Sequence, residues 1–191
     1  MLKILLISLC AFFSGCAFNP QKANVSPTVA VMPSSEGKGG SVAVRVIDER
    51  PSKSLGHRGT AYRAAAEITS AQELSFIVQR EISAALQKKG FSVIEYADDA
   101  NPRLTVELRL LEYTTSQGFW TGGVQIKGAL KAIAANGSRT FEKMYRSEKE
   151  ERIVMVPTAE TNERWINESL NDVLNQLLND NILFSVLKNG G

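Results

Sequence analysis

The sequence predicts an α+β fold, built as a two-layer sandwich in which a mostly antiparallel sheet carries two helices packed on one face. Several stretches alternate apolar and polar residues with period two, which is typical of strands that have one buried and one solvated face. Two other stretches repeat apolar residues every three or four positions, the spacing of an amphipathic helix. The order of strand, helix, four strands and helix indicates a single domain without an internal repeat.

The first residues indicate a targeting signal and not a folded element. Lys3 precedes an apolar run that reaches Phe13, and this run is too short to cross a bilayer as a helix. The run ends in Ser14-Gly15-Cys16, which supplies small residues and a thiol. An ordinary cleaved signal peptide and an uncleaved buried helix are the two alternatives to a lipoprotein signal.

Residues 13–16 resemble a bacterial lipobox. The resemblance implies cleavage before Cys16, acylation of its thiol with chains such as palmitate, and attachment to a membrane. Ala17 follows the cysteine, and by the same resemblance this implies the outer membrane, with the domain facing the periplasm. We therefore expect a signal peptide over 1–15, a lipidated Cys16 and tether over 16–40, and one periplasmic domain over 41–191.

Composition excludes several classes of function. The chain has 22 Lys and Arg against 20 Asp and Glu, a balance that argues against a nucleic-acid surface, and no such partner is expected. Cys10 leaves with the signal and Cys16 carries lipid, so a disulfide framework, a thiolate metal site and a cysteine nucleophile are not expected. The single histidine cannot build a histidine-rich metal site, and neither a P-loop nor a dinucleotide fingerprint is present. We expect no metal and no cofactor. The sequence does not indicate whether the protein is a monomer or an oligomer.

The first part of the mature chain is predicted to be loosely structured. Residues 17–27 are polar and contain two prolines, as expected of a tether. Residues 29–32 form a short apolar patch that fits an edge strand. Ser41–Asp48 alternates valines with Arg45 and is the first secure strand, ended by Pro51.

A loop at 55–59 and a short strand at 62–69 lead to the first helix. Ser70 and Glu73 match a capping box, so the helix should begin there. Gly90 should end it in the left-handed conformation. The apolar stripe consists of Leu74, Ile77, Val78, Ile82, Ala85 and Leu86.

Four strands and a second helix follow. We expect strands at 91–96, 103–114, 124–135 and 139–153, and the pair Asn136-Gly137 predicts a tight hairpin turn before the last of them. The strand at 103–114 alternates Leu104, Val106, Leu108 and Leu110 with polar residues. Thr161 or Asn162 should cap the second helix, whose stripe is Ile166, Leu170, Val173, Leu174, Leu177 and Leu178. A last apolar turn at 182–187 should fold back on the core.

The order of several short motifs along the chain resembles that in the YajG-like family of uncharacterised bacterial outer-membrane lipoproteins. The motifs are the lipobox at Cys16, Val25-Ser26-Pro27, Asp48 and Arg50 at a strand end, Lys89-Gly90-Phe91, Ser116-Gln117-Gly118 and the tail from Leu174 to Leu187. The resemblance covers nearly the whole mature chain, and it implies no enzymatic activity.

Three groups of residues are candidates for function. Asp48 and Arg50 lie at a strand end, where they could orient a ligand or simply pair with each other. His57 has no recognisable nucleophile partner, so no catalytic residue is expected. Phe119 and Trp120 stand between glycines in a hairpin loop, where they could contact a partner protein or the membrane, or cap the core.

These observations favour a non-enzymatic lipoprotein that acts as an accessory or interaction module in envelope assembly or maintenance. An envelope protein is then the candidate partner, alongside the membrane that holds the acyl chains. The alternative is a lipoprotein that binds a lipid, a glycan or a peptidoglycan fragment. An enzyme is the third hypothesis.

Overall fold

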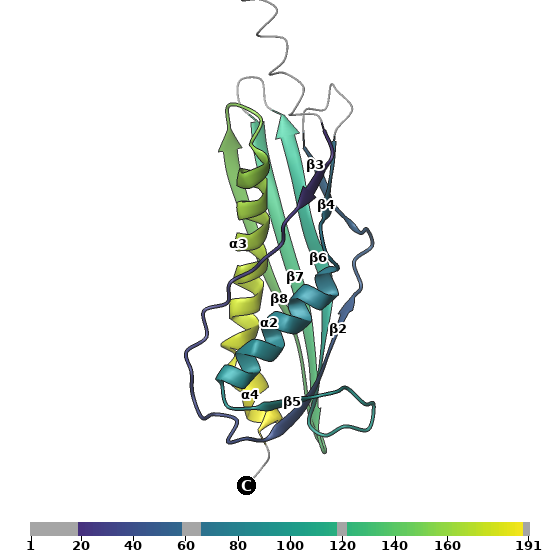
Figure 1. Cartoon of the computed structure of the whole chain (residues 1–191), viewed down its shortest axis with the longest axis vertical. Helices are drawn as coiled ribbons and strands as arrows, with labels where there is room; N and C mark the ends of the chain where they lie inside the picture. The colour runs from purple at the N-terminus through teal and green to yellow at the C-terminus, as the bar shows by residue number, and fades with distance from the viewer. Residues whose placement is uncertain (1–18, 59–65, 118–121, 189–191) are drawn as a thin grey trace, which may run out of the picture.

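The strands form one curled, mixed sheet of eight strands, and the helices cover one of its faces (Figure 1). The structure is a computed structural model that describes residues 19–58, 66–117 and 122–188. The strands are β1 (Gln21–Ala23), β2 (Ser41–Asp48), β3 (Ser54–Arg58), β4 (Ala66–Ser70), β5 (Ser92–Ile94), β6 (Arg103–Gln117), β7 (Gly122–Asn136) and β8 (Arg139–Ile153). The helices are α2 (Leu74–Lys88), α3 (Ala159–Leu178) and α4 (Asn181–Leu187).

The predicted two-layer sandwich with a mostly antiparallel sheet and two helices is wrong. β1–β4, β2–β5, β2–β6 and β3–β6 pair in parallel, and the helix α4 lies on the covered face beside α3. The parallel pairs arise because the chain that leaves β2 returns through β3, β4 and α2 before it enters β5 and β6. Alternation along a strand reports which face is buried, and it does not report the direction of the neighbouring strand.

The long strand β6 organises the sheet. β7 pairs with it along one side, and β8 pairs with the far side of β7, both antiparallel. On the other side of β6, β2 pairs with its first half and β3 with its second half (Figure 1). The sheet therefore has two short groups of strands that lie end to end against one long strand.

A register shift between Leu108 and Leu110 changes the face that β6 buries. Leu104, Val106 and Leu108 are fully buried before the shift, and Leu111 and Tyr113 are buried after it. Leu110 is only half-buried, so the predicted core alternation is right up to Leu108 and wrong beyond it. An extra residue in one strand moves all later side chains to the opposite face.

The hairpin predicted at Asn136-Gly137 is confirmed, although its turn lies one residue later. Asn136 pairs with Arg139 as the last residue of β7, which leaves Gly137 and Ser138 in the turn. Gly137 has a φ of 61°, as the first position of a type II′ turn requires. The Asn136 amide instead donates to the carbonyls of Val186 and Lys188 at 2.9 and 3.0 Å, and so ties the hairpin to the end of α4.

Helix α2 is confirmed, but the capping box is wrong. Ser70 is the last residue of β4, and Glu73 is the N-cap without a side-chain hydrogen bond. At the other end Gly90 has a φ of 84°, and the amides of Gly90 and Phe91 donate to Gln87 and Leu86. These two bonds form a complete Schellman motif, so the predicted glycine stop is confirmed.

Helices α3 and α4 begin at other residues than the sequence suggested. Thr158, not Thr161 or Asn162, caps α3, because its Oγ1 accepts the amide of Thr161 at 3.3 Å. The apolar turn predicted at 182–187 is the helix α4, which Asp180 caps. Its residues Leu183, Phe184 and Leu187 are buried, so this turn does fold back on the core.

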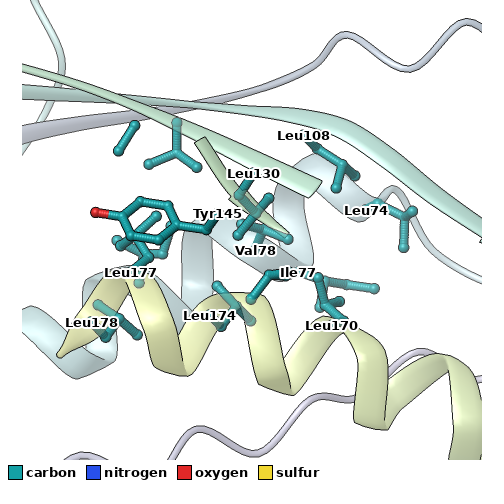
Figure 2. Close-up of a cluster of buried hydrophobic side chains, with 14 of the residues drawn as sticks. Leu74, Ile77, Val78, Leu108, Leu130, Tyr145, Leu170, Leu174, Leu177 and Leu178 are labelled. Atoms are coloured by element: carbon teal, nitrogen blue, oxygen red, sulfur yellow. The ribbon is translucent and has the colours of Figure 1, made fainter. Parts of the chain in front are cut away.

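The core lies between the helices and one face of the sheet. Figure 2 shows Leu108, Leu130 and Tyr145 of the sheet facing Leu170, Leu174, Leu177 and Leu178 of α3 and Leu74, Ile77 and Val78 of α2. Both predicted helical stripes are confirmed by this packing, since Val78 and Leu174 are fully buried.

The segment expected to be a tether is part of the fold. Gln21–Ala23 forms β1, which pairs with β4, and Val25 is only 4% exposed. The edge strand expected at 29–32 does not form, and the loop expected at 55–59 contains the strand β3. Within the described residues, the strand expected at 62–69 corresponds to β4, which runs from Ala66 to Ser70.

Candidate functional site

Three of the predicted site residues lie outside the described part of the chain. They are Cys16, the expected lipid attachment site, and Phe119 and Trp120, the expected partner contact. These assignments stay predictions. Asn19 is the described residue nearest to Cys16 in the sequence, and Gln117 and Gly122 are those nearest to Phe119 and Trp120.

Asp48 and Arg50 form a buried ion pair. Arg50 Nε and Nη2 donate to the two carboxylate oxygens of Asp48 at 2.9 and 3.0 Å, and the two side chains are 4% and 6% exposed, Arg50 first. Lys53 Nζ lies 3.0 Å from the same carboxylate. Burial raises the pKa of Asp48, but the hydrogen bonds from Arg50 and Lys53 outweigh burial and hold this pKa below its usual value. These ion pairs therefore stabilise the end of β2 and the turn that follows it.

One nitrogen of this ion pair has no hydrogen bond within the part of the chain that is described. Arg50 Nη1 is buried and unpaired, and Arg50 lines a narrow hollow of about 240 Å³ together with Glu67 and Gln72. A buried guanidinium N–H needs an acceptor, and a water in this hollow can supply one.

His57 does not belong to a buried catalytic cluster. It lies exposed on β3, beside a hollow of about 320 Å³ whose lining includes Ser54, Glu112 and Tyr113. Within residues 19–58, 66–117 and 122–188, no group of three His, Cys, Asp or Glu side chains is arranged to hold a metal ion. In the same ranges, no helix is long and apolar enough to cross a membrane.

The structure brings together a polar network that the sequence did not reveal. Tyr113 on β6 donates to Asn162 Oδ1 on α3 at 2.7 Å, and Asn162 Nδ2 donates to Gln21 Oε1 at 3.0 Å. Gln21 Nε2 in turn donates to the carbonyl of Ala159 at 2.9 Å. Burial raises the pKa of Tyr113 to about 12, against the opposing charge of Arg58, so the phenol stays protonated as a donor.

This network ties the beginning of the fold to the beginning of α3. Its members are separated by up to 141 residues in the chain, and Asn162 is fully buried. The only sequence signal for it is a polar residue at a core position, since Asn162 lies four residues before the apolar Ile166 in the α3 stripe. A buried amide is expensive unless it is hydrogen-bonded, so the network holds β1 in one place.

A row of asparagines on α3 continues the attachment. The amides of Ser26, Thr28 and Ala30 donate to the side-chain oxygens of Asn167, Asn171 and Asn175 at 2.7, 2.7 and 3.3 Å. The spacings match, because four helical residues rise about 6 Å and two extended residues advance about 6.6 Å. We call residues 24–31 the strap, an extended segment that α3 holds by its side chains.

Comparisons with known proteins place the chain among lipoproteins. A family model described as "Uncharacterized lipoprotein" matches residues 27–188. A search of curated proteins found no match.

Solved structures with partial likeness include a putative neuraminyllactose-binding hemagglutinin homolog from Helicobacter pylori. It is 13% identical, with 83% of this chain and 94% of that chain covered and a TM-score of 0.46. Lipoprotein GNA1162 from Neisseria meningitidis is 11% identical, with 74% and 99% covered and a TM-score of 0.36. At these scores neither likeness extends to binding or activity.

The family model covers most of the chain, including the strap from residue 27 onward, the strands β2 to β8 and all three described helices. The resemblance drawn from the short motifs is confirmed, and the chain belongs to this family of uncharacterised lipoproteins.

Proposed function

We propose that the chain is a lipid-anchored lipoprotein on the periplasmic face of the outer membrane, acting as a non-enzymatic interaction module in envelope assembly or maintenance. Acyl chains on Cys16 hold it to the membrane. The observation that carries the interaction role is the second face of the sheet, over which no helix or strand of the described residues lies. We call this surface of β6, β7 and β8 the open face.

The open face is polar and charged. Lys131 Nζ lies 2.7 Å from a carboxylate oxygen of Glu142, and Lys127 Nζ lies 3.7 Å from a carboxylate oxygen of Glu148. Each pair joins β7 to β8. Gln125 Nε2 donates to Glu148 at 2.7 Å. Alternating charges of this kind give a surface that is soluble when free and selective toward a partner of matching charge pattern. An envelope protein is the partner that such a surface fits.

Photo-crosslinking in intact cells tests this role. A photoreactive amino acid replaces Met144, which the β7–β8 register places on the open face opposite Lys131. The control replaces Phe76, which is 64% exposed on α2. We expect a discrete protein adduct from position 144 and none from position 76. Adducts from position 76 alone, or from neither position, would contradict the proposal.

Anchoring is tested separately at Cys16. Cys16→Ser removes the thiol that accepts the acyl chain, so the variant should incorporate no labelled palmitate and should leave the membrane fraction or stay unprocessed. A control with Cys10→Ser should keep full labelling, because residue 10 lies within the expected signal peptide. Unchanged labelling of the Cys16 variant would refute the anchor.

A hollow at one end of the open face favours ligand binding as the second candidate function. It measures about 480 Å³ and is lined by Arg45, Tyr96, Arg103, Ile47 and Ile133 among others. The Arg45 guanidinium lies 4.1 Å from the centre of the Tyr96 ring, so it already covers one face of that ring. Glu107 and Glu142 also line it. A ligand there would meet two arginines, two glutamates and an apolar floor, which suits a fragment with both carboxylates and amines, such as one from peptidoglycan.

Calorimetric titration with a soluble peptidoglycan fragment tests the second candidate. Arg45→Ala should weaken binding by about tenfold, because an arginine–carboxylate contact is lost. Arg164→Ala is the control, since this side chain lies on α3 and is 59% exposed. Absence of heat with the parent chain would remove this candidate.

A further inference from the structure

The connection from β8 to α3 exposes two adjacent apolar side chains. Val154 is 85% exposed and Met155 is 76% exposed. The other large exposed apolar side chains of the described residues, Met32, Phe76, Ile94 and Ile182, each stand alone in the sequence. Single exposed apolar residues are ordinary on protein surfaces, but an adjacent pair beside Ile153 is a small apolar tip that water solvates poorly.

This tip lies at the end of the domain where the chain enters the fold. Gln21, the first residue of β1, donates to the carbonyl of Ala159, only four residues after Met155. Figure 1 shows the start of β1 and the β8–α3 connection at the same end of the long axis, and α4 at the opposite end. The position of the tip therefore depends on where the beginning of the chain is held.

The covalent chain keeps this end close to Cys16. Asn19 is the first described residue, and three peptide steps separate it from Cys16, so their Cα atoms are at most about 11 Å apart. β1 and the strap are bound to α3, so little free chain remains between a lipid on Cys16 and the folded domain. A lipid on Cys16 would place the tip within reach of the membrane surface.

We infer that Val154 and Met155 insert into the leaflet that carries the Cys16 acyl chains and form a second membrane contact. The inference rests on the proposed lipid anchor. Once the acyl chains hold the domain, insertion becomes effectively intramolecular, so a small apolar contact suffices. The loop enters only the interfacial layer, to about 5–10 Å, because its backbone groups still need water as a partner.

Charges near the tip are nearly balanced, so the contact is apolar in character. The basic and acidic residues of the adjoining strand and helix ends are Lys22, Arg58, Arg152 and Arg164 against Glu151, Glu160 and Glu163, and Arg58 donates to the carbonyl of Pro157. Attraction to anionic lipid is therefore weak, and salt should have little effect on insertion. Two points of attachment at one end of the domain restrict its orientation, with the tip in the leaflet and α4 at the end away from it.

A fluorescent probe of depth tests the inference on the lipidated full chain. Met155→Cys adds the only free thiol of the mature protein, because Cys16 is acylated and Cys10 is removed with the signal. The thiol is labelled with an NBD dye, and the protein is reconstituted into vesicles of phosphatidylethanolamine and phosphatidylglycerol with or without spin-labelled acyl chains. Ile182→Cys, on α4 and 64% exposed, is the matched control. Flotation of the vesicles first reports whether the chain is anchored.

We expect the probe at position 155 to be blue-shifted and quenched about twofold by the spin-labelled lipid, and the probe at 182 to be unaffected. Adding Val154→Asp to the labelled variant should return the probe to water, with the melting temperature unchanged because the site is exposed.

Each other outcome overturns a defined part of the inference. A floated chain whose probe at 155 is no more quenched than the probe at 182 refutes the second contact and leaves the anchor intact. A blue-shifted but unquenched probe shows that another copy of the chain covers the tip. A chain that does not float refutes both the anchor and the membrane contact.

Discussion

At the scale of single residues, Gly56 decides how closely β3 approaches β6. The two strands meet at one bridge, Gly56 opposite Tyr113, and Gly56 has a φ of 138°. A Cβ on Gly56 would lie 1.8 Å from the Tyr113 carbonyl oxygen, a distance that no real contact tolerates. Only glycine therefore allows this bridge, which joins β3, β4 and β1 to the rest of the sheet.

Gly56→Ala should lower the free energy of unfolding by about 3 kcal/mol or more, because it combines backbone strain with a clash against the backbone of β6. Urea denaturation measures the loss. Gly39→Ala is the matched control, since Gly39 has a φ of 75° but no atom within 4 Å of an added Cβ. The control should lose only about 1 kcal/mol from conformational strain. Equal losses would show that the bridge adapts to a side chain.

Asp180 links the cap of α4 to β8. Its Oδ1 accepts the amides of Ile182 and Leu183 at 2.9 and 3.3 Å, and its Oδ2 accepts Lys143 Nζ at 2.6 Å and the Tyr145 hydroxyl at 3.0 Å. Burial raises the pKa of Asp180, but these hydrogen bonds outweigh burial and bring the pKa below its usual value. The ionised form is therefore the one that the fold favours.

The sign of the pH dependence follows from this lowered pKa. The contribution of Asp180 is fully present above the unfolded pKa, about 3.9, and is lost as the pH falls through the folded pKa. Asp180→Asn keeps an N-cap acceptor but loses the charge, so at neutral pH it should cost about 1–2 kcal/mol. Below about pH 5 its stability should also fall less steeply than that of the parent.

Urea denaturation across this pH range measures both effects. Asp172→Asn is the control, because Asp172 is 44% exposed and lies 3.6 Å from Lys149. It should change stability by less than about 0.5 kcal/mol. A parallel pH dependence of the parent and Asp180→Asn would show that Asp180 does not act through its charge.

At the scale of elements, the strap behaves as a strand whose partner is a helix. Its first residues continue the alternation of β1, because Val25 and Pro27 are buried like Ala23 before them, and the residues between these three are exposed. The exposed side of its backbone bonds to the asparagine row of α3 instead of to another strand. Side-chain acceptors thus replace a β-ladder, which is why the pattern of an edge strand at 29–32 did not lead to one.

Asn171→Ala should release the middle of the strap without unfolding the domain, because it removes the acceptor of the Thr28 amide at an exposed position. Amide hydrogen exchange followed by NMR should show Thr28 exchanging about tenfold faster, while amides of the buried β7 stay protected. Asn171→Asp keeps an acceptor oxygen in the same place and should keep Thr28 slow. Unchanged exchange in the alanine variant would show that packing of the valines alone holds the strap.

At the scale of the whole molecule, the placement of Phe119 and Trp120 bears on the partner. If they contact a partner protein, changing both to Ser should leave the free energy of unfolding within about 0.5 kcal/mol of the parent and abolish the crosslinked adduct. If they cap the core, the double variant should lose about 3 kcal/mol or more.

Tryptophan fluorescence separates the same alternatives. Trp165, which lies on α3 and is 7% exposed, also emits and must first be changed to Phe. A blue-shifted Trp120 that quenchers do not reach, together with a large loss of stability, would contradict the partner contact.

The sequence by itself determined the elements whose signal is local. The apolar stripes of α2 and α3, the glycine stop at Gly90 and the alternation of β7 and of β6 up to Leu108 were all predictable, because the helical and strand periods are visible in neighbouring residues. The hairpin at Gly137 was predictable for the same reason, and the order of the short motifs was enough to indicate the lipoprotein family. The spacing of Asp48 and Arg50 likewise allowed the ion pair that the structure contains.

Only the tertiary structure decided which strands are neighbours and which distant residues meet. The parallel pairing of β2 with β6 and of β1 with β4 depends on how the whole chain returns through α2, and no residue of either strand encodes its partner. The bulge after Leu108, the network of Tyr113, Asn162 and Gln21, and the strap on α3 are of this kind. The same holds for the apolar tip, because Val154 and Met155 become a membrane-facing candidate only once folding brings them to the same end of the molecule as the start of β1. Such contacts join residues far apart in the chain. The free energy that stabilises them comes from burial and hydrogen bonding between distant residues, which no local sequence pattern indicates.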